Sequence, residues 1–210
     1  MKALLLALTL ICSVATASAQ KEERIPRYFS EPIIVDSSST MMFVIRYNTE
    51  LFGSNKISLW DDYYANIIFY DFKSDSSKRL FSEDTFIKAF PPSNSNMLFS
   101  NDRAPRRETG TSSWIFYFVK PFDYDNSGRI DSRDPSVLYV SDRHGNNLKA
   151  ITPSNENALS IQLFEKQQIA LIKMQRDYDG DKNFEYSDLD YYYVKLDLQT
   201  LSLGNKIEVR

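Results

Sequence analysis

Short apolar or alternating runs, separated by turn-forming residues, follow one another along most of this 210-residue chain. The runs are rich in Ile, Val, Phe and Tyr, which favour β-strands. Residues typical of turns separate them at positions 36–39, 73–77, 143–147 and 199–204. Because no window of comparable strength has an apolar period of about 3.6 residues, the sequence predicts an all-β chain.

The runs fall into three sets of four. The sets comprise residues 32–36, 40–47, 66–72 and 79–81, then 97–101, 113–122, 137–141 and 149–152, then 158–164, 168–175, 191–196 and 205–209. They predict three successive four-stranded antiparallel meanders, similar to propeller blades, at about 31–90, 95–153 and 157–210 of a single β domain, 31–210. Since propellers usually have at least four blades, we expect an open stack with protected edge strands or completion by a partner.

An acidic twelve-residue segment, 123–134, reads D-Y-D-N-S-G-R-I-D-S-R-D. Alternate positions of a tight calcium loop direct oxygen ligands at one centre, with a backbone carbonyl at position 7 and a glycine at position 6, here Gly128. The predicted ligands are Asp123, Asp125, Ser127, the carbonyl of Arg129, Asp131 and Asp134. A hard cation takes six to eight oxygen ligands, so the segment has the composition of a metal loop.

A second segment, 177–188, repeats this pattern and reads D-Y-D-G-D-K-N-F-E-Y-S-D. Its predicted ligands are Asp177, Asp179, Asp181, the carbonyl of Asn183, Glu185 and Asp188. Lys182 replaces the glycine at position 6, where positive φ costs a non-glycine residue about 1 kcal/mol.

Both acidic segments fall between the second and third runs of their sets. Acidic residues are common in β-turns, but two loops in register predict two sites for Ca²⁺, and Lys182 makes the second loop the poorer match to the pattern. Aspartate at position 12 is shorter than the usual glutamate. We therefore expect modest affinity, with a dissociation constant of roughly 10⁻⁴ to 10⁻³ M.

Residues 137–142 (V-L-Y-V-S-D), 145–148 (G-N-N-L) and 150–153 (A-I-T-P) resemble repeats of TolB-like six-bladed propellers of the bacterial periplasm. The resemblance implies propeller-type blades. EF-hands and dockerins share the acidic pattern of the loops. However, the strand-like runs that follow, 137–140 and 191–194, make both loops more similar to the integrin-type calcium hairpin, which implies structural calcium between two strands.

The N-terminus has the pattern of an export signal. Met1 and Lys2 precede an apolar stretch, 3–14, and a small-residue cleavage site, 17–19, which predict a signal peptide over 1–19 and a polar leader over 20–30. The apolar stretch is shorter than the roughly 20 residues of a transmembrane helix. We therefore expect a periplasmic or extracellular protein. Cys12 is the single cysteine, so its removal excludes thiol catalysis and cysteine-ligated metals.

The sequence contains no convincing catalytic constellation. His144 is the single histidine and lies in a turn, and the net charge of −3 argues against a nucleic-acid partner. A candidate sugar or peptide site combines aromatic and acidic residues, although these could simply pack against a neighbouring blade: Trp60, Asp61, Asp62 and Tyr63.

These features predict an exported calcium-binding β protein that acts as a binding or scaffold module for a protein or glycan. One alternative is a carbohydrate-active hydrolase that uses carboxylates. The other is an assembly subunit, including a homo-oligomer, that pairs through an exposed blade edge.

Overall fold

The computed structural model describes residues 27–35, 39–47, 63–88 and 113–208. These residues form two antiparallel sheets, and within them the one helical element is the 3₁₀ turn η1 (Glu165–Gln167). The prediction of an all-β chain is confirmed. Neither sheet closes on itself in this part of the chain.

The first sheet has nine strands, in the order β1-β3-β4-β6-β7-β8-β9, with β2 paired to β3 and β5 paired to β4. Its strands are β1 (Arg27–Phe29), β2 (Ile33–Ile34), β3 (Thr40–Tyr47), β4 (Tyr63–Asp71), β5 (Ser76–Arg79), β6 (Phe86–Lys88), β7 (Trp114–Lys120), β8 (Val137–Asp142) and β9 (Lys149–Ala150).

The second sheet is a four-stranded meander in chain order. Its strands are β10 (Asn157–Phe164), β11 (Ile169–Gln175), β12 (Tyr191–Asp197) and β13 (Leu203–Glu208). They correspond to the four runs of the third predicted meander.

The first two predicted meanders do not form separate sheets. The short strand β6 pairs with β4 at Tyr63↔Lys88 and with β7 at Phe86↔Lys120, and so joins them into one sheet. The predicted strand at 97–101 lies outside the described residues.

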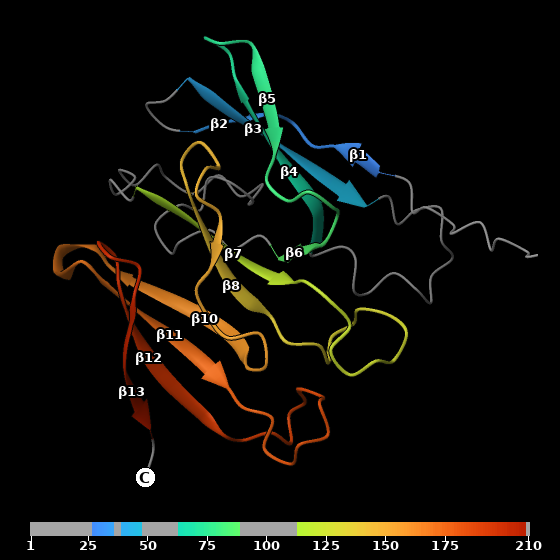
Figure 1. Cartoon of the computed structure of the whole chain (residues 1–210), viewed down its shortest axis with the longest axis vertical. Helices are drawn as coiled ribbons and strands as arrows, with labels where there is room; N and C mark the ends of the chain where they lie inside the picture. Colours follow the sequence, from blue (N-terminus) through green and yellow to red (C-terminus); the bar gives the residue numbers. More distant parts are fainter. Residues whose placement is uncertain (1–26, 36–38, 48–62, 89–112, 209–210) are drawn as a thin grey trace, which may run out of the picture.

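Strand β7 is buried on both faces, because apolar residues occupy nearly every position along it. Phe116 and Phe118 pack into a core with β8 and β10–β12, whereas Tyr117 and Val119 pack into a second core with β3 and β4. Figure 1 shows β7 and β8 between β1–β5 on one side and β10–β13 on the other. The described strands therefore form three layers, β1–β5, β7–β8 and β10–β13, with one core on each side of the middle layer.

Candidate metal centre

The two acidic segments form the loops that connect β7 to β8 and β11 to β12. Figure 1 shows the first loop in yellow and the second in orange, both on the same side of the lower half of the view. Each loop begins after one strand and ends before the next, so neither is flanked by helices. Adjacent antiparallel strands thus fix the two ends of each loop.

Three carboxylates come together in each loop, and one side-chain oxygen of each lies within 4.8 Å of the other two. The groups are Asp123, Asp125 and Asp134 in the first loop, and Asp177, Asp179 and Asp188 in the second. Two oxygens that share a calcium ion at about 2.3–2.6 Å lie at most about 5 Å apart. The spacing is therefore that of ligands around a common cation.

The buried aspartate at position 12 ties each loop together. The Asp134 carboxylate accepts the backbone N–H groups of Tyr124 at 2.7 Å and Asp131 at 2.6 Å. In the second loop the same two bonds, both 3.0 Å long, join Asp188 to the N–H groups of Tyr178 and Glu185. Asp134 is 0% and Asp188 3% exposed. Backbone hydrogen bonds therefore hold both carboxylates inside the fold.

Positions 1 and 6 also match between the loops. Asp123 accepts the N–H of Gly128 at 2.7 Å, and Asp177 accepts the N–H of Lys182 at 2.9 Å. Gly128 has φ of 91° and Lys182 has φ of 67°. Positive φ at Lys182 is confirmed, and the second loop tolerates the expected backbone strain.

The other predicted ligands of the first loop have protein partners. The Ser127 hydroxyl donates to the Arg129 carbonyl at 3.0 Å. Asp131 accepts the backbone N–H of Arg133 at 2.9 Å and its guanidinium at 3.1 Å. Burial alone would raise the pKa of Asp131, but the bonds from Arg133 keep that pKa below its ordinary value. In the close group, the N–H of Ser127 lowers the pKa of Asp125, which favours the ionised form that a cation requires.

In the second loop, Asp181 accepts the N–H of Asn183 at 2.7 Å, which lowers the pKa of Asp181. The side chain of Glu185 is exposed, and its carbonyl accepts a hydrogen bond from Gln175 at 2.8 Å. The Asn183 side-chain oxygen is buried and accepts no hydrogen bond from the described residues. An amide oxygen of this kind can serve as a ligand for a hard cation.

The two loops are joined directly and through a buried relay. Phe184 donates its N–H to the Arg133 carbonyl at 2.9 Å, which links the loops by their backbones. The relay begins at the Ser136 N–H, which donates to Asn157 at 2.9 Å, and the Asn157 amide donates to Gln175 at 2.9 Å. Gln175 then donates to the Glu185 and Asp188 carbonyls at 2.8 and 3.1 Å. The ends of both loops therefore share one hydrogen-bond network.

Sequence reasoning missed Arg133, although it is the eleventh residue of the first loop. Its guanidinium lies 3.1 Å from Asp131 and 3.6 Å from Asp125. The hydrogen bond and the negative charge of Asp131 raise the pKa of Arg133, and the charge of Glu185 in the second loop acts in the same direction. A basic residue inside an acidic segment was the available signal.

The candidate sugar or peptide site is described only in part. Tyr63 is the first residue of β4 and lines a cleft of about 880 Å³ beside both loops. Trp60, Asp61 and Asp62 lie outside the described residues. Their predicted role stays a prediction.

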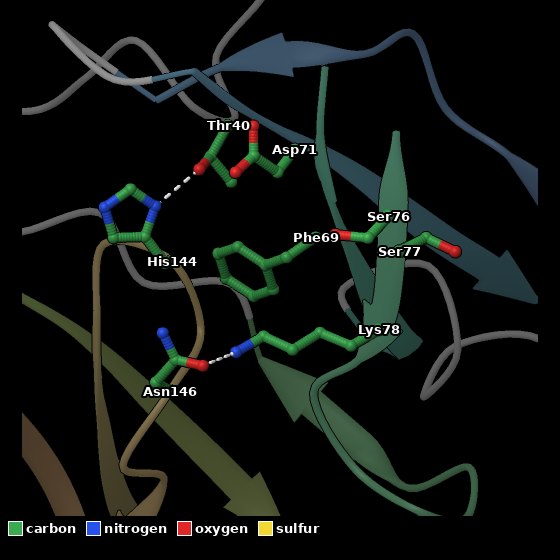
Figure 2. A pocket seen from close by; sticks show the side chains of 8 residues that line it. All are labelled: Thr40, Phe69, Asp71, Ser76, Ser77, Lys78, His144 and Asn146. Atoms are coloured by element: carbon green, nitrogen blue, oxygen red, sulfur yellow. Dashed lines mark hydrogen bonds between the residues drawn. The ribbon is translucent and has the colours of Figure 1, made fainter. Parts of the chain in front are cut away.

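A smaller cavity of about 380 Å³ lies between the turn that joins β8 to β9 and the strands β3, β4 and β5. Figure 2 shows His144 and Asn146 of this turn facing β3, β4 and β5. His144 Nδ1 lies 2.6 Å from the Thr40 hydroxyl, and Lys78 donates to the Asn146 side chain. The contacts give the turn a structural role: it docks onto the N-terminal strands.

Replacement of Gly145 by alanine should lower the free energy of unfolding by about 2 kcal/mol, because backbone strain and overpacking combine. Gly145 has φ of 69°, and a Cβ there would lie 2.4 Å from the Phe69 ring. Gly180→Ala is the matched control, since φ is 78° and nothing lies within 4 Å of its added Cβ. Urea unfolding in chelator should show the larger loss for Gly145→Ala, and equal losses would contradict the close packing.

The chain matches no protein-family model and no curated protein. Its described part contains no helix with the length and apolar character needed to span a bilayer.

Proposed function

We propose that this chain is an exported calcium-binding β protein, a binding or scaffold module in which two calcium ions have a structural role. The observation that carries the proposal is the repetition of one framework at equivalent positions of two loops. In both, positions 1, 3 and 12 supply the gathered carboxylates, and position 12 accepts the same two backbone N–H groups.

Calcium fits the chemistry of these donors better than softer metals. Each gathered ligand is a carboxylate, and carboxylate and carbonyl oxygens are the ligands of hard cations, whereas zinc and copper sites draw on histidine and cysteine. The first site would use Asp123, Asp125 and Asp134, and the second Asp177, Asp179 and Asp188. The carbonyls of Arg129 and Asn183 are the further ligands expected from the loop pattern.

The proposed role of calcium follows from the position of the loops. Each loop joins two adjacent strands, and three carboxylates repel one another at short range unless a cation lies between them. A ligand that binds only the folded chain stabilises it by about 2.7 kcal/mol at 100 times its dissociation constant. Calcium would therefore fasten the β7–β8 and β11–β12 hairpins and hold the module in one shape.

Calorimetric titration of calcium into chelator-treated protein should give two sites and a higher melting temperature. Asp123→Ala should remove the first site and leave a second site that binds several-fold more weakly, and Asp177→Ala should do the reverse, because each removes one carboxylate from one of two linked loops. Glu165→Ala, in the η1 turn, is a control that should retain both sites. A flat titration with unchanged melting would overturn the proposal.

A further inference from the structure

The cleft that contains Tyr63 lies where the core between the two sheets ends. Its volume of about 880 Å³ falls within the roughly 300–1,000 Å³ typical of ligand pockets. One wall of the cleft comes from the first sheet. Another wall comes from the start of β10 and from residues of β11 and β12, and the two acidic loops complete the cleft with residues such as Arg133 and Tyr186. Both sheets and both acidic loops therefore contribute to its lining.

The cleft has the opposite charge to the chain as a whole. Its basic side chains are Lys88, Lys120, Arg133 and Lys173, and its single lining acid is Glu185. Loop carboxylates offset Arg133 and Lys120, so the remaining two lysines and one glutamate leave +1. The whole chain has a net charge of −3. A local reversal of sign of this kind concentrates anions at a pocket.

Two of these cations are available to a ligand. Arg133 is paired with Asp131 and Asp125, and the buried Lys120 ammonium donates to the carbonyls of Ser132 and Asp134. Among the residues that the structure describes, Lys88 and Lys173 form no ion pair. They belong to β6 of one sheet and β11 of the other, so they present positive charge from different walls.

Flat aromatic faces accompany these charges. Tyr63 lies opposite Lys88 across β4 and β6, and Lys88 lies opposite Phe118 across β6 and β7, so the three residues form one cross-strand row. On the second wall, the Lys173 ammonium lies 4.7 Å from the centre of the Tyr191 ring. Tyr186, which also lines the cleft, is 98% exposed.

We propose that this cleft binds an acidic oligosaccharide, with sugar carboxylates against Lys88 and Lys173 and sugar rings against the tyrosine side chains. Lysines on two walls suit a ligand with more than one carboxylate, such as a chain of uronic acids. Tyrosine faces and the serine residues of the lining, Ser132, Ser136 and Ser187, suit rings that carry hydroxyl groups. None of the six gathered carboxylates lines the cleft, so a failure of this proposal would leave the calcium proposal standing.

The test is a calorimetric titration of the full chain with two matched tetrasaccharides. Cellouronate, a β-1,4-linked glucuronate chain, should bind, whereas cellotetraose, which carries a hydroxymethyl group in place of each carboxylate, should bind at least about tenfold more weakly. Lys88→Met and Lys173→Met should each raise the cellouronate dissociation constant about tenfold, the loss expected for one charge-assisted contact. The control Lys149→Met, on the exposed strand β9 outside the cleft, should bind like the unaltered protein.

Thermal unfolding of each variant distinguishes a lost contact from a lost fold, since both lysines are at least partly exposed and their replacement should leave the melting temperature unchanged. No cellouronate binding, or equal binding of cellotetraose, would overturn the proposal. So would equal weakening by Lys149→Met, which would indicate nonspecific charge attraction. Tighter binding of hexaglutamate than of cellouronate would replace the saccharide by an acidic peptide.

Discussion

Asp134→Ala should destabilise the protein by about 3 kcal/mol even in chelator, where calcium contributes nothing. The Asp134 carboxylate is fully buried and accepts the N–H groups of Tyr124 and Asp131. Its removal leaves two donors without their partner, at about 1–3 kcal/mol each where they stay buried. Urea unfolding in chelator measures the loss.

The control for this prediction is Asp123→Ala in the same loop. Asp123 also accepts two N–H groups, those of Ser127 and Gly128, but these residues are exposed, so water can replace the carboxylate. We expect a loss of about 1 kcal/mol or less in chelator, although both variants should lose the first proposed calcium site. If Asp123→Ala proves as destabilising as Asp134→Ala, position 12 has no special structural role.

Gln175→Ala should cost about 3 kcal/mol and should also weaken the coupling between the two proposed calcium sites. Gln175 is 4% exposed, and its side chain bonds Asn157 and the carbonyls of Glu185 and Asp188. Each bond contributes about 1 kcal/mol, and its loss leaves a polar group with one partner fewer. Because the relay joins the ends of both loops, order at one site should favour order at the other.

The coupling is measurable as a difference between two pairs of titrations. In the otherwise unaltered protein, Asp177→Ala should weaken calcium binding at the first site several-fold. In the Gln175→Ala protein the effect should be smaller, because only the direct bond between Phe184 and Arg133 still joins the loops. Gln162→Ala, at an exposed position of β10, is the matched control and should retain the coupling. Equal effects of Asp177→Ala in all three backgrounds would exclude the relay as the connection.

The sequence predicted the loops well because their requirements are local. The carboxylates at positions 1, 3 and 12 of one twelve-residue turn come together in both loops, and positive φ at position 6 belongs to the same turn. The strands of the third meander were equally predictable. Their buried residues alternate, as at Ala170, Ile172 and Met174 of β11, because one face of the sheet packs on the core.

Other features depend on distant partners and have no local signal. The three residues of β6 are too few to show a period, and the strand exists because β4 and β7 lie on either side of it. Likewise, Asn157 and Gln175 are polar residues at strand ends, where exposure is the usual expectation. They are buried because each hydrogen-bonds groups ten or more positions away along the chain, as when Asn157 accepts the N–H of Ser136 and Gln175 donates to the carbonyl of Asp188.

Anomalous diffraction from crystals grown with calcium tests the central claim most directly. Two peaks are expected, each about 2.3–2.6 Å from the three gathered carboxylates of its loop, with the carbonyl of Arg129 or Asn183 as a further ligand. Ordered loops that show no peak at either group, in crystals soaked at several millimolar calcium, would contradict the account.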